Sequence, residues 1–190
     1  MKMPSKAKQV LSELNKLDQA VYAAVAGSPT PSLDAGLRRL SDAANYSRIS
    51  GGVSIGLAVL GGPKGRRAAL RGMASIAVTS AVLNALVKPV AKRARPDRDG
   101  AAVPAARHVR MPRSHSFPSG HSASAFAFAV GVGHVMPWSI PPLTLLAAGV
   151  AYSRVHTGVH YPGDVIIGSL AGTILGEATN TLLDRKGIAT

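Results

Sequence analysis

A long uncharged tract does most to limit how this chain can fold. From Ser114 through Ser153 the sequence contains no Asp, Glu, Lys or Arg, and a proline-rich stretch at residues 136–142 divides the tract into two pieces of helix length. Because proline disrupts a helix interior, this pattern is typical of two apolar helices joined by a turn. We therefore expect a helical hairpin in this region.

Further apolar runs lie on both sides of the expected hairpin, at residues 49–63, 72–87 and 165–183. The first two are separated by a basic stretch at residues 64–71, as at the flanks of membrane helices. The runs are short beside the roughly 20 residues of a spanning helix, and no strand-like alternation is convincing. The sequence predicts an all-α, polytopic membrane helix bundle with about five apolar helices, and a soluble bundle rich in Ala and Gly is the alternative.

The N-terminal part has a different pattern. Residues 5–26 and 33–44 place apolar side chains at helical spacing, with a Gly- and Pro-containing break at 27–32. We expect amphipathic helices that either pack on the core or lie flat at a membrane interface. We divide the chain into an N-terminal amphipathic helical segment (1–48) and a membrane core (49–190), within a single domain overall.

The charge balance indicates an anionic partner. The 190 residues include 22 Lys and Arg against 9 Asp and Glu, a formal net charge of +13, which suits nucleic acid, an acidic membrane surface or a phosphorylated substrate. Aromatic residues make up only 4%, which is low for a protein that stacks bases, so we expect no nucleic-acid partner. The absence of cysteine excludes disulfides, a thiolate nucleophile and cysteine metal sites.

Three polar segments interrupt the apolar runs. In the first, residues 88–96, Lys88 and Arg95 are seven residues apart and share a face if the segment is helical, and Pro96 should end that helix. We interpret the other basic residues nearby as a positive membrane flank; they are Lys92, Arg93, Arg98, Arg107, Arg110 and Arg113.

The other two segments carry histidines at expected helix starts. Residues 118–121 form a Pro-Ser-Gly-His turn, so the histidine should lie where free backbone N–H groups and the helix dipole bind anions. In residues 153–164, Pro162 suits the first turn of the last helix and places His160 within reach of Asp164. A carboxylate on one imidazole nitrogen leaves the other nitrogen as a nucleophile or base.

If the helices alternate in direction, all three segments meet at one side of the bundle. Such a convergence indicates a catalytic anion site, and its members are Lys88, Arg95, His121, Arg154, His160 and Asp164. Only Asp164 among the carboxylates has a place there, which is too few for a two-metal site, so we expect no metal.

These segments resemble the signature motifs of the type 2 phosphatidic acid phosphatase superfamily, which includes lipid phosphatases, bacterial acid phosphatases and vanadium haloperoxidases. The matching residues are Lys, six residues and Arg-Pro; Pro-Ser-Gly-His; and Ser-Arg, five residues, His, three residues and Asp, in the family's order. The resemblance covers residues 88–164, whereas 1–48 carry no signature of this kind.

The resemblance implies a role for each matching residue. His160 would attack phosphorus to form a phosphohistidine, Asp164 would orient it, and His121 would protonate the leaving alcohol. The phosphoryl oxygens would be held by the Lys88, Arg95, Arg154 and Ser119 side chains and the Gly120 amide. Water would then hydrolyse the intermediate, without cofactor or metal.

The apolar helices favour a membrane lipid or polyprenyl-linked phosphate within this superfamily. Small size and composition resemble the members that act on decaprenylphosphoryl-5-phosphoribose, which we expect as substrate ahead of another prenyl phosphate. Undecaprenyl pyrophosphate, phosphatidylglycerophosphate and phosphatidic acid remain open, as do a soluble acid phosphatase or haloperoxidase-like enzyme and a non-catalytic basic membrane-binding protein. Oligomeric state also stays open.

We expect a multi-pass protein of the cell membrane. The side that carries the three polar segments holds 16 of the 22 Lys and Arg residues, those within 1–49 and 88–114 together with Arg154. Because cytoplasmic loops are enriched in positive residues, this distribution slightly favours a cytoplasmic active site.

Overall fold

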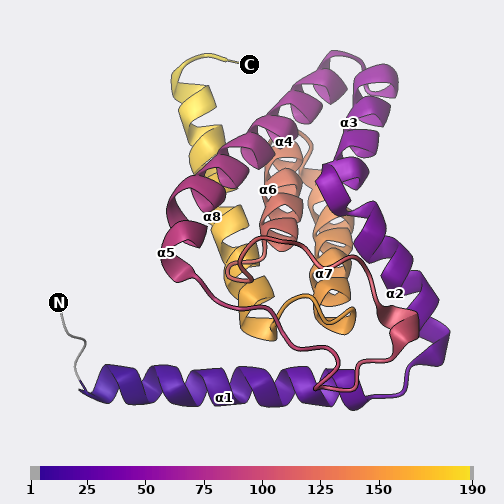
Figure 1. Ribbon diagram of the computed structural model, residues 1–190. Coiled ribbons are helices and arrows are strands. Elements are labelled where there is room, and N and C mark those ends of the chain that lie inside the picture. The colour runs from indigo at the N-terminus through magenta and orange to yellow at the C-terminus, as the bar shows by residue number, and fades with distance from the viewer. Residues whose placement is uncertain (1–4, 189–190) are drawn as a thin grey trace.

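The computed structural model describes residues 5–188, and its regular structure is entirely helical, with no strand in that part of the chain (Figure 1). The bundle consists of α3 (Arg48–Leu60), α4 (Gly62–Val82), α6 (Gly120–Val135), α7 (Ile140–His156) and α8 (Pro162–Arg185). Two N-terminal helices, α1 (Ser5–Gly27) and α2 (Pro31–Ala43), precede it. The expected all-α fold is therefore confirmed.

Short helical pieces connect the long helices. A 3₁₀ turn, η1 (Asn45–Ser47), joins α2 to α3, and a π-helical stretch, η2 (Leu83–Val87), continues α4 into the four-residue α5 (Lys88–Ala91). Two more 3₁₀ turns are η3 (Ala105–Arg107) and η4 (Pro137–Ser139). Because η4 separates α6 from α7, the helical hairpin expected from the uncharged tract is confirmed.

Helix α6 occupies the centre of the bundle and packs against α4, α7 and α8. Small residues allow these close approaches. A Cβ atom at Gly131 of α6 would lie 2.7 Å from the backbone oxygen of Arg71 in α4, and one at Gly168 of α8 would lie 2.5 Å from that of Ser119. The Gly-rich composition of the core segment is thus used to bring helix backbones into contact.

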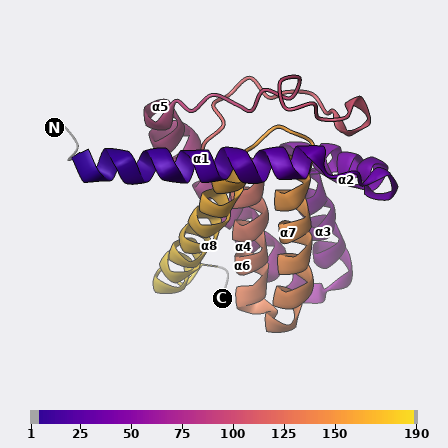
Figure 2. The same cartoon turned by 90° about the horizontal axis from the view of Figure 1, so that it is seen from below.

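Helix α1 runs across one end of the bundle rather than along it, as Figures 1 and 2 both show. Near its C-terminal end, Tyr22 and Ala26 are buried in a cluster with Val155 of α7 and Val165 of α8. Further toward the N-terminus its apolar side chains remain exposed, including Leu14. The helix is anchored at one end and presents an apolar face along the rest.

Two helical segments are long and apolar enough to cross a membrane: Gly62–Ala91, of 30 residues, and Pro162–Arg185, of 24 residues. The other bundle helices are shorter, at 13 residues for α3, 16 for α6 and 17 for α7. Helices α3, α6, α7 and α8 coincide with apolar runs of the sequence, whereas α4 includes the basic stretch at residues 64–71 that we expected to separate two runs.

The expectation that Lys88 and Arg95 share one helix face is wrong. Helix α5 ends at Ala91, and Lys92 adopts a left-handed backbone conformation with φ 43°. Arg95 precedes Pro96, and contact with the proline ring disfavours helical backbone at the residue before a proline. The chain therefore leaves the helix before Arg95 and follows a non-helical path across the end of the bundle.

Candidate active site

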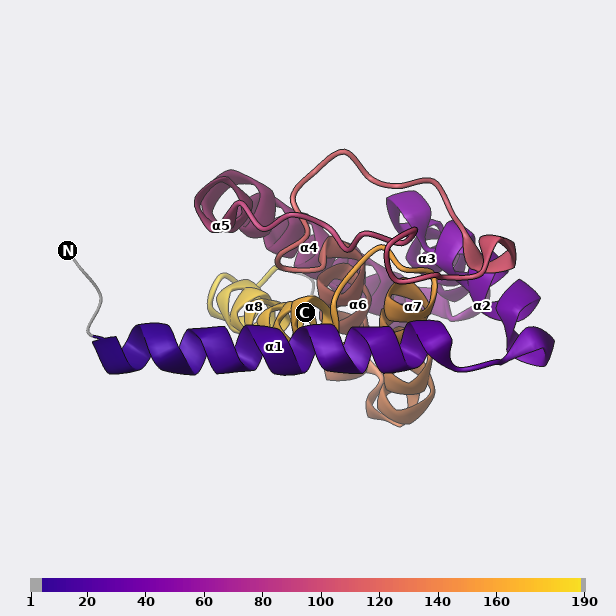
Figure 3. The ribbon, with the colours of Figure 1, turned by 60° about the horizontal axis from the view of Figure 1, so that its bottom comes forward.

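The three polar segments meet at the end of the bundle that α1 crosses. Figure 3 brings this end forward and shows the long α5–α6 connection passing over it beside the α7–α8 loop. The Ser119 N–H group donates to the backbone oxygen of Asp164 at 2.9 Å, and a Cβ at Gly120 would lie 3.4 Å from Nζ of Lys88. The meeting expected from alternating helix directions therefore occurs.

His160 lies fully buried in the α7–α8 loop and is held from both sides of its ring. Its Nε2 accepts from Nη1 of Arg95 at 3.2 Å, and its Nδ1 faces Oδ2 of Asp164 at 3.4 Å. Because a guanidinium can only donate, Nε2 carries the lone pair and Nδ1 carries the hydrogen. This tautomer leaves Nε2 as the nucleophilic nitrogen.

Burial lowers the pKa of His160 to about 4, and the positive charges of Arg95 and Arg154 act in the same direction. The Asp164 carboxylate opposes the shift in pKa through its hydrogen bond and charge. The imidazole is consequently neutral at neutral pH. A neutral ring with a lone pair on Nε2 is what nucleophilic attack requires.

The Asp164 carboxylate is bonded through both oxygens. Oδ2 accepts from the Ser116 hydroxyl and from the Tyr161 N–H at 2.9 Å, while Oδ1 accepts from Nη1 of Arg93 at 2.8 Å. Our interpretation of Arg93 as a membrane flank is therefore wrong. Neither Ser116 nor Arg93 could be assigned from the sequence, because their pairing with Asp164 depends on how the α5–α6 connection packs.

Arg154 is completely buried near the C-terminal end of α7. Its Nη1 donates to the backbone oxygen and the hydroxyl of Ser41 at 3.1 and 2.7 Å, whereas Nε and Nη2 have no hydrogen-bond partner among the described residues. Buried charged donors without partners are costly unless an anion completes the site. Arg154 therefore offers two donors that could bind an anion.

Two further cations lie close by but differ in their contacts. Lys88 is partly buried, and its ammonium has no hydrogen-bond partner within residues 5–188. Arg95 is held by carbonyl oxygens, with Nη1 donating to Val159 at 2.7 Å and Nε to Ser114 at 2.9 Å. The Lys88 ammonium can therefore move with a bound ligand, whereas hydrogen bonds fix the position of the Arg95 guanidinium.

Helix α6 begins at Gly120, so His121 lies in its first turn as predicted. The Ser119 hydroxyl caps this helix by accepting from the Ser122 N–H at 3.4 Å. Nε2 of His121 donates to Oδ1 of Asn45 at 2.9 Å.

Asn45 was not predicted as a site residue. It begins η1, where Tyr46 and Ser47 adopt left-handed backbone conformations with φ of 57° and 54°. This sharp bend turns the end of α2 toward the start of α6. No local sequence signal identifies such a bend, because neither residue is glycine.

Our interpretation of Arg107 as part of a positive membrane flank is also wrong. Its buried guanidinium donates to Oδ1 of Asp34 at 2.9 Å and to the backbone oxygen of Ser28 at 2.6 Å. The same Asp34 oxygen lies 3.1 Å from Nε2 of His156. Arg107 thus joins the end of α1 to α2 and serves the fold.

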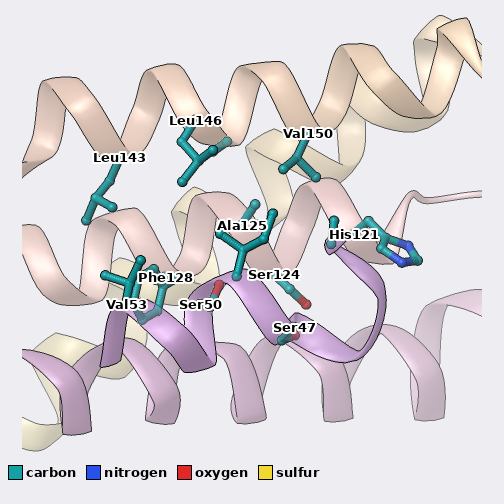
Figure 4. Close-up of a pocket in the computed structure, with 13 residues that line it drawn as sticks. Ser47, Ser50, Val53, His121, Ser124, Ala125, Phe128, Leu143, Leu146 and Val150 are labelled. Carbon is teal, nitrogen blue, oxygen red and sulfur yellow. The ribbon is translucent and has the colours of Figure 1, made fainter. Parts of the chain in front are cut away.

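Two cavities flank the site. Figure 4 shows the narrower one, between α3, α6 and α7, with His121 at one end and Leu143, Leu146 and Phe128 along its walls. Its volume of about 30 Å³ is close to that of a single water in the liquid, so it holds no lipid chain in this state. The wider cavity, of about 630 Å³, lies between α1 and the start of α8.

The site therefore combines a neutral buried histidine, a carboxylate behind it, a second histidine at a helix start and several cations. Within residues 5–188, no three His, Cys, Asp or Glu side chains come together in a way that could hold a metal ion. In such a site the histidine can attack an electron-poor centre while the cations stabilise its negative oxygens, as in phosphoryl transfer.

Comparison with known proteins agrees with this chemistry. The family described as the PAP2 superfamily matches residues 69–187. The decaprenylphosphoryl-5-phosphoribose phosphatase of Mycolicibacterium smegmatis is 37% identical over 152 residues, which cover 78% of this chain and 77% of the relative.

Two crystal structures share the fold. LpxE of Aquifex aeolicus superposes with a TM-score of 0.69 at 23% identity, covering 87% of this chain and 95% of that one. A transmembrane PAP2-type phosphatidylglycerolphosphate phosphatase of Bacillus subtilis superposes with a TM-score of 0.68 at 22% identity, covering 91% and 87%.

Proposed function

This chain belongs to the PAP2 superfamily, and from that premise we propose that it removes the terminal phosphate from a membrane lipid or polyprenyl-linked substrate through a phosphohistidine intermediate. The observation that carries this proposal is the buried Arg154, whose Nε and Nη2 lack partners while Lys88, His121 and His160 surround the same space. A phosphoryl group supplies the negative oxygens that the Arg154 guanidinium and the Lys88 ammonium lack.

The proposed reaction has two displacements at phosphorus. Nε2 of His160 attacks, the P–O bond to the alcohol breaks, and His121 supplies the proton that the departing oxygen needs. Water then attacks the phosphohistidine while His121 takes up a proton, and inorganic phosphate leaves with His160 restored. The first step leaves His121 without this proton and the second step restores it, so the two steps together return the protein to its starting protonation state and consume one water molecule.

The remaining groups stabilise charge on the phosphoryl oxygens. Arg154, Lys88 and Arg95 supply positive charge, and the Ser119 hydroxyl and the Gly120 amide add donors at the positive end of α6. Asp164 holds the His160 tautomer and stabilises the ring as it acquires positive charge. These contributions need no metal, and we propose that the enzyme is metal-independent.

For the leaving group, we propose decaprenylphosphoryl-5-phosphoribose or another prenyl phosphate. The support is the phosphatase of M. smegmatis, which is named for that substrate and which matches most of both chains. The groups proposed above would bind the phosphate and not the alcohol. Discrimination among lipid alcohols must therefore come from surfaces outside this site.

We propose a multi-pass position in the membrane, with the site at the bilayer surface. Large aliphatic side chains are exposed on the bundle helices, including Ile55 of α3, Leu145 of α7 and Ile174 of α8, with exposed fractions of 67%, 76% and 65%. Water disfavours such a belt, whereas lipid does not. Helix α1 would lie flat in the interface with its apolar side inward. The charge distribution supports a cytoplasmic site.

Phosphate release from a panel of prenyl and glycerolipid phosphates tests this function directly. The purified enzyme should release phosphate in excess EDTA, and His160→Ala should abolish turnover, while His134→Asn, at the other end of α6, should retain it. Denatured wild-type enzyme trapped during turnover should carry acid-labile phosphate on histidine. Full turnover by His160→Ala would refute the mechanism.

A further inference from the structure

Arg93 forms a bridge between the N-terminal helix and the site. Its Nη2 donates to Oδ2 of Asp18 in α1 at 2.6 Å, and its Nη1 donates to Oδ1 of Asp164 at 2.8 Å. The guanidinium carbon lies 4.2 Å from the centre of the Tyr161 ring. Asp18 also accepts from the Gly163 N–H at 2.6 Å, so α1 contacts the same turn that carries Asp164.

We propose that Arg93 and Asp18 are positioning residues for the phosphatase reaction: Arg93 fixes the orientation of the Asp164 carboxylate, and Asp18 fixes Arg93 and balances its charge. This inference rests on the proposed function, since it takes His160 as the nucleophile. It gives α1, which contributes no group to the phosphoryl pocket, a part in catalysis.

The geometry of the carboxylate supports the positioning role. Oδ2 of Asp164 faces His160, and Oδ1 is bonded to Arg93. The carboxylate side chain is fully buried, so loss of Arg93 would leave Oδ1 without its charged partner in a low-dielectric environment. The carboxylate would then be held less firmly in the orientation that faces Nδ1 of His160, although its charge would remain beside the ring.

The balance of charges around His160 explains the role that we propose for Asp18. The charged or titratable groups that act on His160 are Asp164, Arg95, Arg154 and His121. Arg93 acts from behind Asp164 and weakens the negative potential that this carboxylate produces at the ring. Asp18, whose side chain is only 12% exposed, offsets that effect by pairing with Arg93.

The two single substitutions should therefore shift the pKa of His160 in opposite directions. Asp18→Asn keeps an oxygen for Gly163 but leaves the Arg93 charge unbalanced, which should lower the pKa of His160. Arg93→Gln removes a positive charge and should raise it. The double variant removes one charge of each sign and should return the pKa close to the wild-type value.

The experiment measures kcat and kcat/KM against pH for the full chain in detergent micelles, with a prenyl monophosphate as substrate. We expect the acid limb of kcat/KM to move down by about 0.5 pH unit in Asp18→Asn and up by a similar amount in Arg93→Gln. We expect kcat to fall about 10-fold in each single variant, with a smaller change in KM. Each rate is scaled to the folded fraction, measured by thermal unfolding.

Glu13→Gln is the matched control. It removes the same charge from α1, but Glu13 is 63% exposed and pairs with Lys16 rather than Arg93. Its acid limb should stay at the wild-type position. The proposal is overturned if the acid limb does not move in Asp18→Asn and Arg93→Gln, or if it moves in the same direction in both. This holds even when His160→Ala is inactive, as the proposed function requires. Turnover by His160→Ala would overturn both the positioning role and the proposed function.

Discussion

At the scale of single residues, the cations of the site differ in how many of their hydrogen-bond donors already have partners in the protein. Arg95 is fixed by backbone oxygens of the α5–α6 connection and of the α7–α8 loop, whereas Arg154 retains two buried donors without partners among the described residues. A protein that keeps such a group gives up stability for function. The stability lost through Arg154 can be measured separately from turnover.

Replacing Arg154 with methionine should abolish activity while making the protein more stable. We expect kcat/KM to fall by about 100-fold or more because charge on the phosphoryl oxygens loses a fixed partner. The free energy of unfolding should rise by about 1 kcal/mol, since the buried unpaired donors are removed. Thermal unfolding with and without vanadate, an anion that resembles phosphate, checks this. Vanadate should raise the Tm of the wild type but not that of Arg154→Met. Arg38→Met, at an exposed position of α2, is the control.

The pH dependence of the wild-type enzyme should reflect the low pKa of His160, which burial brings to about 4. Only the neutral ring has a lone pair on Nε2, so protonation stops the first displacement. We expect kcat/KM to show no decline attributable to His160 between pH 7 and pH 5 and to fall as pH drops through about 4. An acid limb centred near the ordinary histidine pKa of about 6.5 would contradict this assignment.

At the scale of helices, the site depends on how closely α6 and α8 approach. The start of α6 carries Ser119 and His121, and the start of α8 carries Asp164, whose backbone oxygen bonds the Ser119 N–H. Gly168, one turn further along α8, lies directly against the Ser119 backbone. A larger residue there would separate the two helix starts and the histidines they position.

Gly168→Ala should therefore reduce both stability and activity. The added Cβ would lie 2.5 Å from the Ser119 oxygen, which is backbone and cannot rotate away. We expect a loss of about 1–3 kcal/mol in unfolding free energy and a lower kcat in the protein that remains folded. Gly36→Ala in α2 meets no atom within 4 Å and should instead stabilise that helix by about 0.5–1 kcal/mol. Equal effects of the two substitutions would refute the close-packing argument.

At the scale of the whole molecule, polar chemistry and apolar surface are separated. The motif residues and α1 lie at one end, and the α3–α4 turn and the C-terminal end of α8 lie at the other (Figure 1). Between them the bundle exposes aliphatic side chains such as Leu70 and Leu86. Such a molecule fits a bilayer when the ends of the bundle reach the two surfaces.

The proposed orientation can be tested with single cysteines, because the chain has none of its own. Arg110 and Lys64 are both exposed and lie toward opposite ends of the bundle. In intact cells, a membrane-impermeant thiol reagent should label Lys64→Cys and not Arg110→Cys if the active site is cytoplasmic. The reverse pattern would place the site outside, and labelling of neither before lysis would exclude a spanning arrangement with these two ends exposed on opposite sides.

The sequence by itself determined the helices and the positions of the motifs along them. Apolar runs and proline or glycine breaks are local signals, so the hairpin of α6 and α7 and the helix starts at Gly120 and Pro162 could be predicted from them. The pairing of His160 with Asp164 was also accessible, since the two residues are four apart.

Only the tertiary structure decided which distant groups complete the site. Arg93 meets Asp164 and Asp18 across 71 and 75 residues, and Asn45 meets His121 across 76. Nothing in the local sequence distinguishes Arg93 from a membrane-flanking arginine. The difference arises because the α5–α6 connection brings Arg93 within hydrogen-bond distance of a carboxylate in α1 and of another in α8.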